Sequence, residues 1–386
     1  MSSRFINRGA YGDVWSYPQD NRAVKLLEIQ ESDISTLQSA AREIYVLIRG
    51  GTRLVPFLKA EFKYGSVELH MQLMETDLSR KMKSSALTLE ESRTFTADIA
   101  NGLHWMHAHG ISHRDLKPSN VLIHNKRATL CDFGLSRPFC DSTRANNLTD
   151  YMVTRWYRAP EILNAKSNGY TEKIDMWAFG CIVYEMIVRR PMFPVSDAKD
   201  LPKELKRLDE KINRISDTTM KNIARGLLRI KPEERWDPCK CLDELKEPVP
   251  TVTKAYYTGS RITDLYVKGW VTALLSRYPG REHSIMHGLM LFEVSGRTML
   301  SDFHCAMAIA YLIFEKMPCR CGMFKELTQK VSIKKIAEWM CTYYCGTHML
   351  HEYEKTKDVD AIMSNICAHL AIEEEHLRSK KKRRID

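Results

Sequence analysis

The chain has 386 residues, which is more than one compact core usually holds, so its length predicts two domains. Apolar residues make up 44% of the chain and charged residues 27%, a composition that excludes disorder along the whole length. The net charge is +10, and six positive charges lie in the last nine residues, so the rest is only mildly basic and does not indicate a nucleic-acid-binding protein.

The first 70 or so residues predict a small sheet with one helix. Short runs rich in β-branched residues favour strands, and one longer stretch has the helical period. We expect strands at Asp13–Ser16, Arg22–Leu27 and Val67–Leu73, and a helix at Ser35–Ile48.

The segment from Ile6 to Val14 predicts a strand, a turn and a second strand. Its glycines, Gly9 and Gly12, would let backbone amides come close to phosphate groups. Asn7 occupies the place of the first glycine in the G-x-G-x-x-G pattern. We therefore expect the loop to lie less close to a nucleotide, without losing its ability to bind one.

Lys25 ends an Ala-Val-Lys strand, and Glu43 lies on the helix that follows. Phosphoryl transfer needs a lysine on the phosphates and a carboxylate that holds this lysine in place. Most exposed lysine and glutamate residues have no such role. The order of strand and helix predicts that these two form an ion pair.

From Leu89 onward helical patterns dominate, and they predict a larger helical lobe. Loops rich in Pro, Asn and Asp separate the helices. We expect these helices at Glu90–His107, Asp175–Val188, Leu201–Ile215 and Met220–Leu228.

Two loop motifs of this lobe carry the chemistry. In the first, His-Arg-Asp-Leu-Lys-Pro-Ser-Asn, Asp115 is the candidate base, Lys117 could reach the transferred phosphate, and Asn120 offers a neutral oxygen to magnesium. In the second, Asp-Phe-Gly, Asp132 would give a carboxylate to the same hard cation. Either motif alone could be an ordinary loop, but both together, in this order, predict phosphoryl transfer from ATP with Mg²⁺.

Two prolines within Lys246–Pro250 interrupt the helical pattern, because proline lacks the amide hydrogen. We place a linker at residues 248–254, an all-α second domain at residues 255–375 and a basic tail at residues 376–386. The expected helices of the second domain are Ile262–Ser276, Ser284–Val294, Asp302–Met317, Gly322–Val331, Ile333–Tyr344 and Val359–Glu375.

Residues 4–247 resemble the eukaryotic protein kinase domain. The resemblance implies an α+β, bilobal fold with a small β-rich N-lobe and a helical C-lobe, and it implies ATP and Mg²⁺ as cofactors. Asp115 and Lys117 would be catalytic, and Asn120 and Asp132 would bind the metal. The residues expected at the ATP site are Ile6, Gly9, Gly12, Val14, Ala23, Lys25, Glu43, Met71, Gln72 and Met74.

Two segments resemble the proline-directed branch of this family, in particular mitogen-activated protein kinases. Leu73–Leu78 is similar to their hinge, which would place Met71 as the gatekeeper and backbone groups near Gln72 and Met74 on the adenine. Thr149–Glu161 resembles their activation segment. The resemblance implies an active Ser/Thr kinase whose protein substrates carry proline after the phosphoacceptor.

The same resemblance implies phosphorylation of Thr149 and Tyr151, and Arg158 would shape the pocket for the substrate proline. Glu161 and Arg235 are expected to form a buried ion pair that braces the helical lobe. The arginines expected to receive phosphothreonine are Arg42, Arg114 and Arg137.

The helix that carries Glu43 is also similar to the cyclin-contacting helix of cyclin-dependent kinases, and residues 255–350 resemble a single cyclin box. Trp270 followed by Tyr278 and then Ser284–Glu293 matches its first two helices without gaps, and Ser301–Lys316 resembles its central buried helix. The resemblance implies an all-α, cyclin-like regulatory domain fused to the kinase. An unrelated helical interaction domain is the alternative.

Two positions depart from the cyclin pattern: Asp264 stands where arginine is usual, and Cys341 where glutamate is usual. These departures put a docking groove for substrate motifs in doubt. Asn7 favours a second hypothesis for the whole chain, a nucleotide-binding pseudokinase scaffold. Against it, the lysine, carboxylates and amide that transfer requires are all present.

The first residues contain no apolar core of signal-peptide length, and Phe303–Phe314 is too short to span a bilayer. We therefore expect an intracellular, soluble protein without membrane partners, whose 11 cysteines are reduced. Lys380–Arg384 is either a solvated end, a nuclear import signal or a polyanion-binding segment.

Overall fold

The structure is a computed structural model of the chain, and it describes residues 3–8, 12–30, 34–138, 155–163, 171–195, 200–251, 288, 305–310, 312, 327 and 331–344. The chain divides into two compact units: Met1–Val252 together with Leu312–Lys316, and Thr253–Tyr311 together with Met317–Asp386. None of the helices in the described ranges combines the length and apolar character that a membrane span requires.

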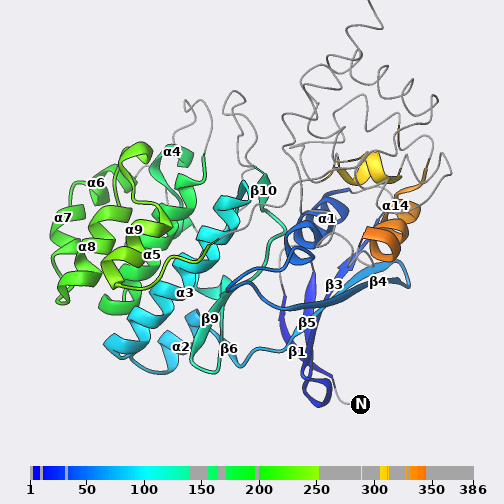
Figure 1. Ribbon diagram of the computed structural model, residues 1–386, viewed down its shortest axis with the longest axis horizontal. Coiled ribbons are helices and arrows are strands. Elements are labelled where there is room, and N and C mark those ends of the chain that lie inside the picture. Colours follow the sequence, from blue (N-terminus) through cyan, green and yellow to red (C-terminus); the bar gives the residue numbers. More distant parts are fainter. Residues whose placement is uncertain are drawn as a thin grey trace, which may run out of the picture. The chain divides into compact units, whose positions relative to one another are not determined.

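The first unit begins with a five-stranded antiparallel sheet in the order β1-β2-β3-β5-β4 (Figure 1). Val24 and Leu27 on β3 and Val67 and Leu69 on β5 are buried, so the two central strands carry the apolar core of this lobe. The strands are β1 (Arg4–Arg8), β2 (Asp13–Tyr17), β3 (Arg22–Glu28), β4 (Phe57–Lys63) and β5 (Ser66–Gln72).

Helix α1 (Ser35–Leu47) packs against β3, and every residue from Leu37 to Leu47 is buried. A helix on a protein surface normally buries one face only. The side-chain amide of Gln38 donates a hydrogen bond of 3.0 Å to the carbonyl oxygen of Leu312, a residue that groups with the same compact unit. Helix α1 is therefore enclosed rather than exposed.

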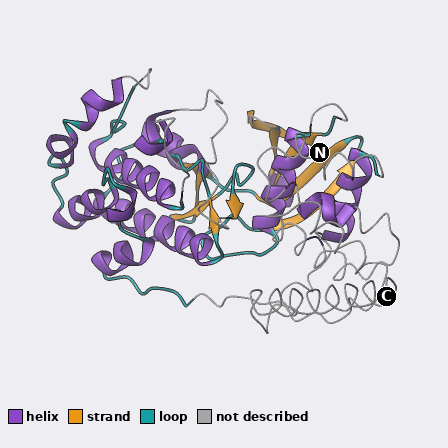
Figure 2. Ribbon diagram, turned by 90° about the horizontal axis from the view of Figure 1, so that it is seen from above, coloured by secondary structure: helices purple, strands orange, loops and turns teal. Residues whose placement is uncertain are grey.

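Helices make up most of the second lobe of this unit (Figure 2). Helix α5 is buried from Ile174 to Tyr184 without interruption, so it forms the centre of the lobe. The helices are α2 (Leu78–Ser84), α3 (Leu89–Ala108), α4 (Pro160–Leu163), α5 (Lys173–Val188), α6 (Leu201–Leu205), α7 (Leu208–Ile212), α8 (Thr218–Leu227) and α9 (Pro238–Leu245).

Five short strands bring the two chemical motifs together. One small sheet has the order β6-β8-β9, and β7 pairs with β10. The Asp115 loop joins β7 to β8, and the Asp132 loop joins β9 to β10. Because β8 pairs with β9 and β7 pairs with β10, paired strands flank the two loops at both ends. The strands are β6 (Thr76–Asp77), β7 (Ile111–Ser112), β8 (Val121–His124), β9 (Arg127–Leu130) and β10 (Arg137–Pro138).

The single helix predicted at Leu201–Ile215 is wrong, because the structure has two short helices, α6 and α7. Lys211 forms an ion pair with Glu204 and donates a hydrogen bond of 2.6 Å to the carbonyl oxygen of Met192. In one continuous helix, residues seven positions apart lie about 10 Å apart along the axis. The break between the helices allows the Lys211–Glu204 pair to form.

In the second unit, residues 305–310 are helical and buried. Helix α14 (Ile333–Trp339) begins after Ser332, whose side chain accepts a hydrogen bond from the Lys335 N–H, and a π-helical turn follows to Tyr344. The helix predicted at Ile333–Tyr344 is thus present. Trp270 and Tyr278, which carry part of the cyclin resemblance, lie outside the described residues, and so does Asp264, which departs from it.

Candidate active site

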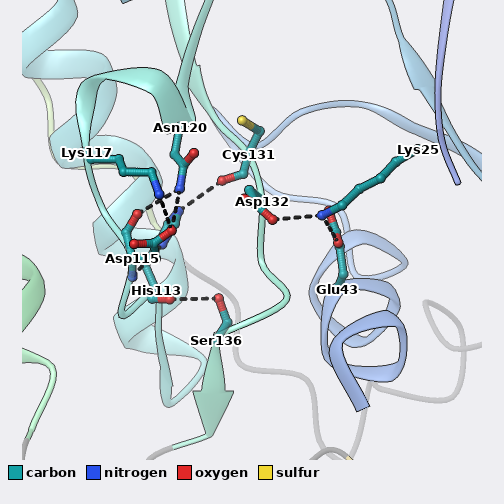
Figure 3. A network of polar contacts seen from close by, with 9 residues as sticks. All are labelled: Lys25, Glu43, His113, Asp115, Lys117, Asn120, Cys131, Asp132 and Ser136. Carbon is teal, nitrogen blue, oxygen red and sulfur yellow. Dashed lines mark hydrogen bonds and ion pairs between the residues drawn. The ribbon is translucent and has the colours of Figure 1, made fainter. Parts of the chain in front are cut away.

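Lys25 lies at the centre of a buried network of charges (Figure 3). Strand β3 carries it, and its Nζ atom lies 2.6 Å from Oε2 of Glu43 on α1 and 2.7 Å from Oδ1 of Asp132. Lys25 is 5% exposed and Glu43 is 1% exposed. The predicted Lys25–Glu43 pair is therefore present, and Asp132 joins it.

The two carboxylates keep the Lys25 ammonium charged. Burial alone would lower its pKa, but the charges of Asp132 and Glu43 outweigh burial and raise the pKa. Burial raises the pKa of Glu43, because Lys25 only partly compensates for the loss of water and Asp132 repels its charge. For Asp132 the balance is reversed: burial acts upward, but Lys25 lowers the pKa overall. Asp132 is thus held in its ionised form.

Asp115 shares its loop with two side chains that bind it. Its Oδ2 atom accepts hydrogen bonds from Nζ of Lys117 at 2.7 Å and from Nδ2 of Asn120 at 3.1 Å. Asn120 also donates to the backbone oxygen of Asp115 at 2.8 Å. Because both donors meet the same oxygen, Oδ1 is the oxygen left to accept a proton.

The buried side chain of Asp175 holds the backbone of this loop, a role that the sequence did not reveal. Its Oδ2 atom accepts the N–H of His113 at 2.8 Å, and its Oδ1 atom accepts the N–H of Arg114 at 2.8 Å. Arg114 has a φ of 72°, in the left-handed region that non-glycine residues seldom adopt. The available signal was an acidic residue in the first turn of a helix whose following residues, from Met176 to Val183, are apolar.

His113 links the Asp115 loop to the Asp132 loop. Its Nε2 atom lies 3.1 Å from the carbonyl oxygen of Cys131, which can only accept, so Nε2 carries the proton. Nδ1 is then free to accept the N–H of Asp115 at 3.4 Å. The His113 ring thus contacts both loops, and the hydroxyl of Ser136 donates a further bond of 3.2 Å to the carbonyl oxygen of His113.

A side chain at Gly134 would meet the hydroxyl of Ser39 on α1. A Cβ atom at this position would lie 2.1 Å from Oγ of Ser39. Asp132 itself has a φ of 64°, and Phe133 is fully buried behind it with its ring 5.5 Å from that of His113. The loop is thus fixed on both sides of the Asp132 carboxylate.

The oxygen atoms around Asp132 suit magnesium, which prefers oxygen ligands. The Asp132 side chain is 39% exposed, and Lys25 contacts its Oδ1 atom. The amide nitrogen of Asn120 is used by Asp115, so its Oδ1 atom is the remaining polar atom of that side chain. One carboxylate and one amide oxygen therefore make a donor set that fits Mg²⁺.

Several residues predicted for ATP lie along β3 and β5. Ala23 and Met71 are opposite each other in the sheet register, and both are buried. The N–H of Gln72 already donates to the carbonyl oxygen of Pro56, and that of Leu73 to Asn21. Met74 has no backbone acceptor within the described part of the chain, so its N–H is the donor left for adenine.

The first strands form the rest of this site. Gly12 lies under β3, since a Cβ atom there would be 2.0 Å from the carbonyl oxygen of Leu26. Val14 on β2 pairs with Lys25 on β3 and with Asn7 on β1, and the side chain of Asn7 accepts the N–H of Arg8 at 3.0 Å. Gly9 lies outside the described residues.

Thr149 and Tyr151, the predicted phosphorylation sites, also lie outside the described residues. Arg42 is buried on α1, and Arg137 on β10 pairs with Ser112, which precedes the Asp115 loop. The predicted ion pair of Arg235 with Glu161 is present, with two bonds of 2.6 and 2.8 Å.

A cluster of Glu61, Glu68 and His70 lies outside this site and brings three potential metal ligands together. Arg22 donates to Nδ1 of His70 at 2.9 Å, so the ring proton must lie on Nε2. Nε2 lies 3.3 Å from each carboxylate. Because this nitrogen carries a proton, the arrangement argues against a metal site.

Comparison with known proteins agrees with this geometry. A family model described as "Protein kinase domain" matches residues 2–245. Mitogen-activated protein kinase 3 from Arabidopsis thaliana is 37% identical over 208 residues, which cover 50% of this chain and 54% of that protein. Mitogen-activated protein kinase mpk-1 from Caenorhabditis elegans is 38% identical over 204 residues, covering 49% of this chain and 45% of that protein.

Mitogen-activated protein kinase 5 from Oryza sativa subsp. indica is 37% identical over 205 residues, covering 50% of this chain and 54% of that protein. The chain therefore spans about half the length of these curated relatives. The family model, in contrast, covers well over half of the chain. With the lysine, carboxylates and amide of phosphoryl transfer assembled at one place, the chain belongs to the protein kinase family.

Proposed function

We propose that this chain transfers the γ-phosphoryl group of ATP to serine or threonine residues of proteins, with a preference for those followed by proline. The Lys25–Glu43–Asp132 network beside Asp115 is the observation that carries the proposal. The similarity to mitogen-activated protein kinases supports the proline preference.

In this mechanism Asp115 orients the substrate hydroxyl and accepts its proton on Oδ1. Lys117, which lies 2.7 Å from the other carboxylate oxygen, offers positive charge where the phosphoryl group passes. Lys25 binds the phosphates of ATP, and Glu43 keeps it in place. Asn120 and Asp132 hold Mg²⁺, which neutralises phosphate charge when bound.

The test is to incubate the full chain with ATP, Mg²⁺ and peptides that differ only in Ser-Pro or Ser-Ala. We expect phosphorylation of the Ser-Pro peptide, and a loss of about 10²- to 10⁴-fold on Asp115→Asn. Asp209→Asn, an exposed acidic residue on α7, is the matched control and should keep full activity. ATP binding without any transfer by the parent chain would instead support a pseudokinase.

We also propose that the second unit is a cyclin-like regulator of the kinase domain on the same chain. The support is the resemblance of residues 255–350 to a cyclin box and of the Glu43 helix to the cyclin-contacting helix of cyclin-dependent kinases. Such a regulator would act on the helix that carries Glu43, and fusion would make its supply independent of a separate protein.

Gln38→Ala in the full chain tests whether the bond to Leu312 supports the helix that carries Glu43. We expect a lower kcat, with nucleotide binding weakened less than turnover, because Glu43 lies on the same helix. Gln19→Ala, an exposed glutamine, is the matched control. Residues 1–248 expressed alone should also be poorly active, and undiminished activity of that fragment would favour an independent module.

We propose that phosphorylation of Thr149 and Tyr151 activates the enzyme, through Arg42, Arg114 and Arg137. Mass spectrometry after treatment with an activating kinase would detect both phosphates, and Thr149→Ala should remove the gain in activity. For Lys380–Arg384 we propose nuclear import, and deletion of residues 378–386 should leave a fluorescent fusion in the cytoplasm.

A further inference from the structure

Arg80 connects the helical lobe to the strand that covers the nucleotide site. It lies on α2, and its Nη2 atom donates a hydrogen bond of 3.1 Å to the carbonyl oxygen of Ile6 on β1. Ile6 immediately precedes Asn7, where the usual glycine is missing. The bond therefore joins the two lobes next to the point at which the glycine loop departs from its pattern.

A β-bulge makes the Ile6 carbonyl available to Arg80. In the β1–β2 register, Phe5 pairs with Trp15 and Asn7 pairs with Val14, so Ile6 has no partner on β2. A bulged residue leaves the regular ladder of hydrogen bonds. The carbonyl oxygen that Arg80 binds therefore belongs to a residue outside the regular β1–β2 pairing.

Asp77 holds Arg80 in the orientation that this bond requires. Oδ2 of Asp77 lies 3.2 Å from Nε of Arg80, and Oδ1 accepts the Arg80 N–H at 2.9 Å as the N-cap of α2. The Asp77 side chain is only 13% exposed, whereas that of Arg80 is 55% exposed. One end of the guanidinium is therefore fixed on the helix while the other reaches β1.

We propose that Arg80 is a positioning residue that ties β1 to α2 and must release Ile6 each time a nucleotide enters or leaves. Nucleotide exchange requires β1 and β2 to move away from the site. A bond between β1 and α2 raises the free-energy barrier to this movement. The proposal rests on the proposed function, because it takes ATP and ADP as the ligands. The Arg80–Ile6 bond would also hold β1 over the nucleotide beside Asn7, where the usual glycine of the loop is missing.

The tie predicts a kinetic pattern that separates it from other roles. If the bond is present with and without nucleotide, its loss lowers the barrier to entry and exit equally. The association and dissociation rate constants then rise together, and Kd stays nearly constant. A direct contact between Arg80 and the nucleotide would instead raise dissociation alone and weaken Kd by the same factor.

The test is stopped-flow binding of a fluorescent ADP with Mg²⁺ to the full chain and to Arg80→Met. We expect both rate constants to rise about three- to tenfold, which corresponds to one hydrogen bond, with Kd changed by less than about twofold. Arg80→Lys should be intermediate, because a lysine cannot bind Asp77 and Ile6 with a rigid fork.

Arg93→Met is the matched control, since Arg93 forms a similar half-exposed ion pair with Asp217 within the helical lobe. It should leave both rate constants unchanged, and thermal unfolding will confirm that all variants fold. Unchanged rates for Arg80→Met, or a rise in dissociation alone, would overturn the tie while leaving the proposed function intact. Failure of the parent chain to bind ADP would overturn both.

Discussion

Lys25 is shared by two carboxylates whose surroundings differ. Glu43 is almost completely buried, whereas the side chain of Asp132 is 39% exposed. The exposed partner is the one that can turn toward a metal, so the buried partner must hold the lysine when this happens. If Asp132 turns away, the buried Lys25 ammonium keeps only Glu43 as an ion-pair partner. Moving it away from Glu43 as well would leave a buried charge without a partner, which costs several kcal/mol. The asymmetry supports the proposed roles, in which Glu43 would orient the lysine and Asp132 would bind the metal.

Glu43→Gln should lower kcat/KM by about 10- to 100-fold, because a bond to a charged group contributes about 1.5–3 kcal/mol. Steady-state kinetics with varied ATP measures this loss. Glu210→Gln is the control, since Glu210 forms only exposed ion pairs, and such pairs contribute little. Equal activity of Glu43→Gln and the parent would remove the assigned role.

Glu185 on α5 gives the fold a pH dependence. Burial raises its pKa above the ordinary 4.5, although the hydroxyl of Tyr157 donates to it at 2.6 Å. A carboxyl with a raised folded pKa stabilises the fold below its unfolded pKa, and this stability is lost as pH rises through the folded pKa. Glu185→Gln should therefore gain melting temperature relative to the parent as the pH is raised over the range above about 4.5.

Thermal unfolding across this range checks the prediction, with Glu233→Gln, an exposed carboxyl, as the control for loss of one charge. A constant difference between Glu185→Gln and the parent would contradict it.

At the scale of elements, α3 depends on how it begins. The Thr88 hydroxyl accepts the N–H of Glu91 at 3.0 Å, and the Glu91 carboxylate accepts the N–H of Thr88 at 2.8 Å. This reciprocal pair satisfies two backbone donors that a helix start leaves open. Since α3 packs against β9, α5 and α9, its start supports the whole helical lobe.

Thr88→Ala should lower the free energy of unfolding of the helical lobe by about 1 kcal/mol. Urea denaturation followed by circular dichroism measures the change. Thr94→Ala on the same helix removes a threonine from the interior, where alanine is the better helix former, and should not destabilise. A similar loss in both variants would mean that the cap contributes nothing specific.

Elements whose signals are local could be predicted from the sequence, and those that depend on distant partners could not. The helix around Glu43 and the strand that carries Lys25 have their own hydrophobic patterns, so both were expected. The break between α6 and α7 follows from the pairing of Lys211 with Glu204 and the carbonyl oxygen of Met192, which no local pattern encodes.

The same distinction holds in the site. Asp115, Asn120 and Asp132 belong to short contiguous motifs and were named from the sequence. Asp175 acts on the Asp115 loop from a helix 60 residues further along the chain, and only the fold brings its carboxylate to the backbone of Arg114.

At the scale of the whole molecule, the match to the kinase family model ends at residue 245. The first compact unit extends further, to Val252, and it also includes Leu312–Lys316. A segment from the second half of the sequence is therefore counted with the kinase lobe. If the regulator is part of the same chain, activity has no bimolecular step.

The specific activity of the full chain should then stay constant on dilution from about micromolar to about nanomolar concentration. A kinase assay over this range tests it. Falling activity on dilution, restored by adding residues 253–386 as a separate protein, would show that the regulator acts between chains.

Helix α1 has no exposed residue between Leu37 and Leu47. An inhibitor designed to displace an external partner from this helix would find no accessible surface to occupy. A compound directed at the proposed nucleotide site would instead meet Asn7 and the Arg80–Ile6 contact beside it. The enclosed helix is thus a poor target for an inhibitor that competes with a partner.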